Sequence, residues 1–428
     1  MKTAVMIVAT LLCASAHADL HQDIDKNAAA VEPNVIAWRR DIHENPELSN
    51  REVRTAALVA AYLKTLGIDV TTGVAHTGVV GILRGGKPGK VVALRADMDA
   101  LPVVEETGLP YASTLTSQYL GQDVGVMHAC GHDNHVAILM GVAKVLAGVR
   151  EQLPGTVKFI FQPAEEGAPP GEEGGAGMMV KDGVLKNPNV DAIFGLHVMQ
   201  IAETGQVAMR PLGAMASSQR FEIAIKGKQT HGAMPWSGID PIVIGSQIVG
   251  ALQTIVSRRL DITASPAVVT VGTFRSGVRN NIVPGDATLT GTIRTFDPAV
   301  TKAVQSEMHD FVTGIATANG AQATLSISDA TPATINDPAL FTQMRPSLVR
   351  IYGEANVLVG NPVMAAEDFA FYQQQVPGLF FFVGVRPPNV PAEEAVPNHS
   401  PKFYADEAAL KNAVRAMASL AADYLQSQ

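Results

Sequence analysis

Short apolar runs alternate along the chain with longer segments that have helical periodicity. Buried strands are predicted at 78–83, 91–94, 157–161, 192–196, 356–359 and 379–385. Helical spacing predicts a helix at 135–149, and a capping-box pattern at Ser49 and Glu52 predicts another that ends at Leu66. Helices that alternate with buried strands are typical of an α/β domain with a largely parallel sheet.

The segment from 215 to 330 has a different pattern, because its strands alternate apolar and polar residues. Strands are expected at 221–225, 267–274, 286–296 and 323–327, and helices at 241–259 and 298–318. This β-α-β-β-α-β order predicts an α+β ferredoxin-like lid domain, inserted into the larger domain. The predicted organisation is a signal peptide at 1–18, a catalytic domain at 19–214 and 331–428, and an inserted lid or dimerisation domain at 215–330.

The N-terminus has the pattern of a secretory signal peptide. Lys2 precedes an apolar run at 5–14, and Ala16-His17-Ala18 fits a cleavage site. The alternative is a buried N-terminal helix. The run is too short to span a membrane, so we expect an exported protein, periplasmic or secreted, with no membrane association after cleavage. Cleavage removes Cys13 and leaves Cys130 without a disulfide partner.

Net charge narrows the range of partners. The chain of 428 residues has 32 Lys and Arg against 40 Asp and Glu, a formal net charge of −8, with no basic block. This balance argues against nucleic acid or an anionic membrane as a partner.

Candidate metal ligands are concentrated in the segment from His128 to His135. Cys130 and His132 are two residues apart, so in an extended segment their side chains face one way. Thiolate and imidazole are donors that Zn²⁺ prefers, and Asp133 is placed to orient a ligating imidazole. The alternative is a buried structural cysteine with helix-capping histidines.

Other polar residues follow buried strands, where α/β sheets place their ligands. Glu165 and Glu166 follow the strand at 157–161, and adjacent side chains there point in opposite directions. One of them can bind a metal while the other acts as a general base, although an acidic solvated loop is the alternative. His197 ends the strand at 192–196, and His399 follows a Pro-rich loop.

A third set of polar residues closes the strand that begins at 91. Asp97 and Asp99 lie in the stretch from Arg95 to Pro102. They are placed either to support a metal site or to form a turn.

Together these segments resemble the amidohydrolase branch of the two-metal aminoacylase/carboxypeptidase superfamily, which includes hippurate hydrolases, N-acyl-amino-acid amidohydrolases and auxin-conjugate hydrolases. The resemblance runs from about Trp38 to the C-terminus. It rests on the motifs at 43–47, 95–102, 128–133, 162–167, 195–197, 230–235 and 367–369. It implies a metallopeptidase-like catalytic domain.

The resemblance also implies a role for each matching residue. Two divalent ions are expected, Zn²⁺ first, with Mn²⁺, Co²⁺ and Ni²⁺ as alternatives. The implied ligands are Cys130, His132, Glu166, His197 and His399. Asp97 and Asp99 are implied to support these ligands from outside the coordination sphere.

The implied catalytic residues are Glu165, as the general base, and His231, which would stabilise the tetrahedral oxyanion. Asn281 and Arg294 match lid positions that would hold the substrate carboxylate. The resemblance predicts Glu-assisted attack of a metal-bound hydroxide on the amide bond of an N-acyl amino acid, with an aryl-acyl group favoured. Lid-mediated homo-oligomers are also implied.

Two rival functions fit parts of the sequence. A carboxypeptidase or dipeptidase would use the same two-metal machinery, so motifs do not separate it from an amidohydrolase. An exported bilobal solute-binding protein fits export and two domains, but it would not need Glu165 beside Glu166 or five convergent ligands.

Overall fold

The computed structural model describes residues 2–328 and 330–427, with side chains from Leu20 onward. The described chain divides into two compact units. The larger unit comprises 1–212, 336–360 and 371–428, and the smaller comprises 213–335 and 361–370. The segment 361–370 thus belongs to the smaller unit, whereas the sequence analysis assigned it to the larger domain.

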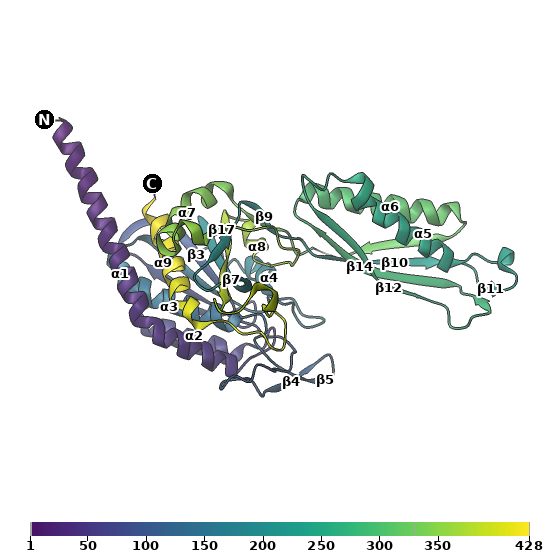
Figure 1. Cartoon of the computed structure of the whole chain (residues 1–428), viewed down its shortest axis with the longest axis horizontal. Helices are drawn as coiled ribbons and strands as arrows, with labels where there is room; N and C mark the ends of the chain where they lie inside the picture. The colour runs from purple at the N-terminus through teal and green to yellow at the C-terminus, as the bar shows by residue number, and fades with distance from the viewer. Residues whose placement is uncertain (1, 329, 428) are drawn as a thin grey trace. The chain divides into compact units, whose positions relative to one another are not determined.

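An eight-stranded mixed sheet forms the larger unit (Figure 1). Its strand order is β1 (Asp69–Val74), β2 (Gly78–Arg84), β6 (Pro154–Gln162), β3 (Lys87–Asp97), β7 (Ala192–Glu203), β18 (Gly378–Arg386), β8 (Val207–Met209) and β17 (Val357–Val359). The four central strands, β6, β3, β7 and β18, run parallel. The predicted largely parallel α/β sheet is therefore confirmed.

The main helices of the larger unit are α1 (Lys2–Glu44), α2 (Val53–Thr65), α3 (His132–Gly148), α4 (Gly175–Lys181), α7 (Pro338–Tyr352), α8 (Ala370–Gln373) and α9 (Leu410–Gln426). A hairpin of β4 (Thr116–Tyr119) and β5 (Gln122–Gly125) forms a separate two-stranded sheet in this unit. Another such sheet pairs β9 (Leu212–Met215) with β16 (Thr334–Asn336), where the chain passes from one unit to the other.

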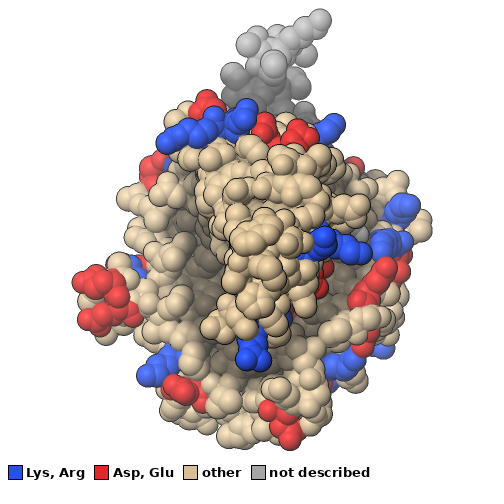
Figure 2. Space-filling view, turned by 90° about the vertical axis from the view of Figure 1, so that its right-hand side faces the viewer, with Lys and Arg blue, Asp and Glu red and all other residues tan. Residues whose placement is uncertain are grey.

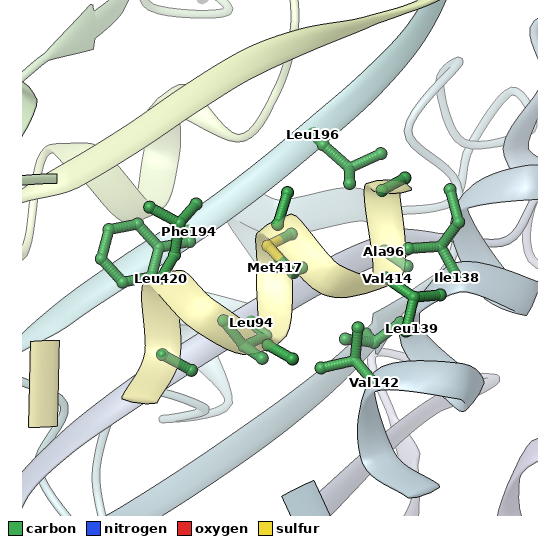
Figure 3. Packing of buried hydrophobic residues seen from close by; sticks show 14 of the residues in the cluster. Leu94, Ala96, Ile138, Leu139, Val142, Phe194, Leu196, Val414, Met417 and Leu420 are labelled. Atoms are coloured by element: carbon green, nitrogen blue, oxygen red, sulfur yellow. The ribbon is translucent and has the colours of Figure 1, made fainter. Parts of the chain in front are cut away.

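Alternate residues of the central strands form the core together with α3 and α9. Figure 3 shows Leu94 of β3 and Phe194 of β7 near Met417 of α9. Arg95 and Asp97 are also buried, but they belong to the other alternating set of β3. The same strand thus supplies apolar side chains to the core and polar ones to the opposite face.

The smaller unit has a four-stranded antiparallel sheet in the order β12 (Ala267–Ser276), β14 (Asp286–Thr295), β10 (Gln219–Lys226) and β15 (Gln322–Ile327). Its helices are α5 (Pro241–Thr254) and α6 (Pro298–Ala318), and a short ladder joins β11 (Thr230–His231) to β13 (Ile282–Val283). Buried Ile and Val from the strands pack against both helices. The predicted ferredoxin-like lid is confirmed.

One helix start differs from its prediction. Ser49 and Glu52 do not form a capping box, because Ser49 Oγ donates to Asp99 and Glu52 makes no side-chain cap at α2. The carboxylate of Glu47 instead accepts the backbone N–H groups of Arg54 and Thr55, both at 2.8 Å. The carboxylate of Glu52 is therefore available to accept a hydrogen bond from another segment, the N–H of Ala164.

Residues 2–18 of the predicted signal peptide fall within α1, and their side chains lie outside the described part of the structure. Among the described residues, no helix combines the length and apolar character needed to cross a membrane. On the face drawn in Figure 2, acidic and basic side chains form small separate groups among uncharged residues.

Candidate metal centre

The predicted ligands of the larger unit meet at the carboxyl ends of its parallel strands. Asp97 ends β3, and Glu165 follows the end of β6 by three residues. His197 lies on β7 two residues beyond the Arg95–Gly195 pair, level with Asp97. This edge of a parallel sheet is where α/β proteins place their ligands.

Cys130 lies at the centre of the group. Its Sγ is 3.3 Å from Nε2 of His197 and 3.3 Å from Nε2 of His399, and that Nε2 is 3.1 Å from Oε1 of Glu166. Ligand atoms of Cys130, His132 and His197 lie within 4.8 Å of one another, as do those of Cys130, Glu166 and His399. The structure thus brings together all five predicted ligands in two sets that share the thiol.

The hydrogen bonds of two histidines fix which nitrogen faces this group. Nδ1 of His132 donates to the carbonyl oxygen of Asp99 at 2.8 Å, and Nδ1 of His197 donates to that of Val198 at 2.8 Å. Each ring therefore presents Nε2 to the cluster, the arrangement in which imidazole binds a metal.

The electrostatics of the group favour a positive charge. Burial raises the pKa of the Cys130 thiol well above its usual value, and Glu166, Glu165 and Asp97 raise it further. Burial lowers the pKa of His132, but Asp97 and Asp99 outweigh it and raise that pKa to about 10. Nε2 of His132 is buried without a hydrogen-bond partner among the described residues. A divalent cation would replace the proton there and stabilise the thiolate, so this donor set fits a metal.

The members of the group differ in their exposure to solvent. His132 and Cys130 are buried, whereas the His399 side chain is 55% exposed. Oε2 of Glu165 lies 4.0 Å from Nε2 of His132 at the edge of the ligand set. An open edge lined by a carboxylate is the arrangement that metal hydrolases use.

Asp97 and His135 form another group of possible ligands with His132, but their own hydrogen bonds indicate a supporting role. Asp97 accepts from Arg95 at one oxygen and from Nδ1 of His135 at the other, both at 2.5 Å. Nε2 of His135 accepts the backbone N–H of Val198 at 2.9 Å. Each carboxylate oxygen of Asp97 and each ring nitrogen of His135 therefore has a hydrogen-bond partner, and these bonds connect β3, α3 and β7. Sequence reasoning gave no role to His135.

Two buried carboxylates hold the backbone that carries Glu165 and Glu166. Asp99 accepts both of their N–H groups at 3.0 Å, and Glu52 accepts the N–H of Ala164 at 2.9 Å. Ala164 has a φ of 52°, so three consecutive amides are fixed across a left-handed residue. Sequence reasoning missed Glu52, because the contact spans 112 positions.

Backbone geometry fixes Cys130 and His399 as well. Gly131 has a φ of 96°, and a Cβ there would lie 2.5 Å from Cγ2 of Val198. Only glycine therefore fits at this position, between the predicted ligands Cys130 and His132. Asn398 donates to the carbonyl oxygens of Cys130 and Val198, and the N–H of His399 donates to that of Ala129.

Asp133 does not orient a ligating imidazole, so that expectation is wrong. It accepts from Nδ1 of His43 at 2.8 Å and pairs with Nε of Arg39 at 2.8 Å. His43 also contacts Glu105 at 3.1 Å, and although burial lowers its pKa, Asp133 and Glu105 raise it overall. This network connects α1 to the start of α3, behind the ligands.

The remaining predicted residues lie in the smaller unit. His231 is exposed on β11, and its Nδ1 accepts the N–H of Ala233 at 3.0 Å, so Nε2 carries the hydrogen. The carbonyl of Asn281 accepts the N–H of Gly232 at 2.8 Å. Arg294 lies on β14, where burial lowers its pKa. His231 and Asn281 line one open hollow with Thr230, and Arg294 is not among its lining residues.

Comparisons with known proteins place the chain in a family. Residues 93–423 match the sequence profile of Peptidase family M20/M25/M40. Thermostable carboxypeptidase 2 of Saccharolobus solfataricus is 41% identical over 94% of this chain and 98% of that relative. IAA-amino acid hydrolase ILR1-like 5 of Arabidopsis thaliana is 40% identical over 91% of this chain and 86% of that relative.

A solved structure gives the same result. The Bacillus subtilis YXEP protein, described as a dinuclear metal binding peptidase from the M20 family, superposes with a TM-score of 0.78. It is 35% identical and covers 94% of this chain and 100% of its own. The chain therefore belongs to Peptidase family M20/M25/M40 and is a metal-dependent hydrolase.

Proposed function

We propose that the protein hydrolyses the amide bond of N-acyl amino acids, with a preference for aryl-acyl groups, and releases a carboxylic acid and a free amino acid. The observation that carries this proposal is the convergence of five donors, with Cys130 in both sets and Glu165 at their open edge. The relative from Arabidopsis thaliana, named an IAA-amino acid hydrolase, supports it.

Two divalent ions are proposed, held by the two donor sets that share Cys130. Those donors are Cys130, His132, Glu166, His197 and His399. The thiolate and three imidazoles favour Zn²⁺ over harder ions. Bound ions of this kind polarise a carbonyl and lower the pKa of water from about 16 to about 7.

Glu165 is proposed as the proton carrier. Its carboxylate takes a proton from the attacking water and delivers it to the nitrogen of the leaving amino acid as the C–N bond breaks. Asp99 holds the Glu165 backbone through its N–H, and this contact keeps the carboxylate at the open edge of the ligand set.

The roles of three residues in the smaller unit stay predictions. Nδ1 of His231 accepts the N–H of Ala233, so the ring hydrogen lies on Nε2. This Nε2–H group is proposed to donate to the oxyanion. Asn281 and Arg294 are proposed to hold the substrate carboxylate, for which a guanidinium is suited by its two parallel donors.

A carboxypeptidase or dipeptidase is the second candidate. The relative from Saccharolobus solfataricus is named a carboxypeptidase and is as similar to this chain as the amidohydrolase relative is. The two activities break the same kind of bond, so only the group on the acyl side distinguishes their substrates.

The deciding experiment measures the release of free amino acid from matched N-acyl amino acids and dipeptides that share one C-terminal residue. We expect N-acyl substrates to be cleaved faster. A chelator should remove the activity, and added Zn²⁺ should restore it. Faster cleavage of the dipeptides would favour the carboxypeptidase, and no turnover of either series by metal-loaded protein would reject both candidates.

We further propose that residues 1–18 direct export to the periplasm or the medium. N-terminal sequencing of the protein from fractions of a bacterial host tests this. A mature chain that begins near Asp19 outside the cytoplasm is expected, and an uncleaved cytoplasmic chain would contradict the proposal.

A further inference from the structure

A cavity of about 120 Å³ opens beside Glu166 within the larger unit. We call it the hairpin cavity, because the tip of the β4–β5 hairpin forms one of its walls. Its lining residues are Leu48, Ser49, Arg51, Ala100, Leu101, Pro102, Gln118, Tyr119, Leu120, Glu166, Gly167, Pro169 and Pro170. This volume is close to the roughly 150 Å³ of an apolar cavity that binds benzene, so it suits a group the size of one aromatic ring.

The chemistry of its walls selects an uncharged occupant. Most of the lining side chains are apolar, with Leu101, Tyr119 and Pro170 on different segments. Its only cationic side chain, Arg51, already pairs with the carboxylate of Glu172 through both terminal nitrogens, at 2.5 and 3.1 Å. A substrate carboxylate would therefore find no unpaired cation here, whereas an apolar group would find rings and aliphatic carbons.

The hairpin tip presents an apolar side chain where a turn does not favour one. Leu120 and Gly121 form a two-residue loop with φ values of 52° and 76°, the type I′ geometry in which Asn-Gly is the usual pair. The Leu120 side chain is 67% exposed and yet lines the cavity. Turn chemistry therefore does not explain a leucine at this position.

We propose that the hairpin cavity receives the acyl group of the substrate, that this group is aromatic or of comparable apolar bulk, and that Tyr119 and Leu120 determine this specificity. The proposal rests on the proposed amidohydrolase function. Glu166 lies both in the ligand set and in the cavity lining, so a scissile carbonyl at the metal centre places its acyl substituent at the cavity mouth.

The test compares kcat/KM for N-benzoylglycine and N-acetylglycine, which share their amino acid and differ in acyl bulk. Leu120→Asn removes the apolar side chain and supplies the residue that the turn prefers, so the hairpin keeps its fold. Tyr119→Ser is the second variant. Val53→Asn is the matched control, because Val53 is 66% exposed on the same unit and lies outside the cavity lining.

We expect the wild type to prefer the benzoyl substrate. The benzoyl-to-acetyl ratio should fall about tenfold in Leu120→Asn and in Tyr119→Ser, and stay unchanged in Val53→Asn. If the wild type cleaves both substrates and neither hairpin variant changes their ratio, the cavity assignment is overturned while the amidohydrolase function stands. If the metal-loaded wild type cleaves no N-acyl amino acid, both fall together.

Discussion

Predicted functional residues are held very differently in the two units. In the larger unit, His132 and Cys130 are buried, and Nδ1 of His132 is fixed by a backbone carbonyl. In the smaller unit, His231 and Asn281 are exposed, and the ring of His231 accepts a hydrogen bond from Ala233 within its own turn. Burying the polar donors of the larger unit without a cation destabilises the fold, whereas the exposed residues of the smaller unit have little effect on its stability.

Because of this difference, substitutions in the two units should affect stability and activity differently. Residues of the metal centre contribute to both, because a buried donor that loses its partners destabilises its surroundings. Exposed residues of the smaller unit can be removed with little effect on folding. Variants of the two units should therefore show distinct combinations of activity, metal content and stability.

The largest effect is expected from Glu165→Gln. The amide keeps the shape of the side chain but takes up no proton, so kcat should fall about 10³-fold while the metal content stays at two ions per chain. Steady-state kinetics and elemental analysis of the same sample measure this. Glu173→Gln, an acid whose partner is Lys181 on the surface, should change neither. A Glu165→Gln enzyme that retains most of its kcat would exclude Glu165 as the proton carrier.

A loss of about 10²-fold in kcat is expected for His231→Ala, the size typical of one lost oxyanion donor. Its metal content and unfolding midpoint should match those of the wild type, because the side chain is exposed. His309→Ala, at another exposed histidine of the smaller unit, is the control. An equal loss in both variants, or a loss of metal from His231→Ala, would contradict the contrast between the units.

The third prediction concerns the pH dependence of stability. Burial and the nearby carboxylate of Asp99 raise the pKa of Glu52 from 4.5 to about 7. The folded chain therefore holds a proton that the unfolded chain has already released, so stability should fall by about 3 kcal/mol as pH rises from about 4.5 to 7.

Glu52→Gln resembles the protonated acid, so it should remove that part of the slope in metal-free protein. Denaturant unfolding at a series of pH values in the presence of a chelator measures it. Glu393→Gln, at an exposed acid, should leave the slope unchanged. Identical slopes in the wild type and Glu52→Gln would show that Glu52 is ionised in the folded state.

Most strands and helices of the fold could be predicted from the local pattern of apolar and polar residues. Apolar runs at 157–161 and 192–196 lie within β6 and β7, and the helix at 298–318 has the bounds of α6. These segments are determined by periodicity and burial, which are properties of neighbouring residues. The five ligands were predicted from motifs, and the structure brings them together, while the role of each stays a prediction.

The misses have a common physical origin in contacts between distant segments. Ser49 and Glu52 have the spacing of a capping box, but Asp99 and Ala164 offer them partners 50 and 112 positions away. Asp133 follows the predicted ligand His132, yet it pairs with His43 and Arg39 of α1. A local pattern cannot indicate which of several polar partners a buried carboxylate will meet.

The smallest effect, on stability alone, is expected from Leu120→Asn. A leucine in the left-handed region costs about 1–2 kcal/mol, and asparagine bears less of that cost, so the free energy of unfolding should rise by about 1 kcal/mol. Denaturant unfolding of metal-loaded protein measures it, with Leu115→Asn, an apolar-to-amide change outside the turn, as the control. A gain in stability together with a loss of aryl-acyl preference would mean that the chain keeps an unfavourable turn residue for the sake of its substrate. A loss of stability would mean instead that Leu120 packs against the cavity walls as part of the fold, and the reason for its unusual backbone would then be structural.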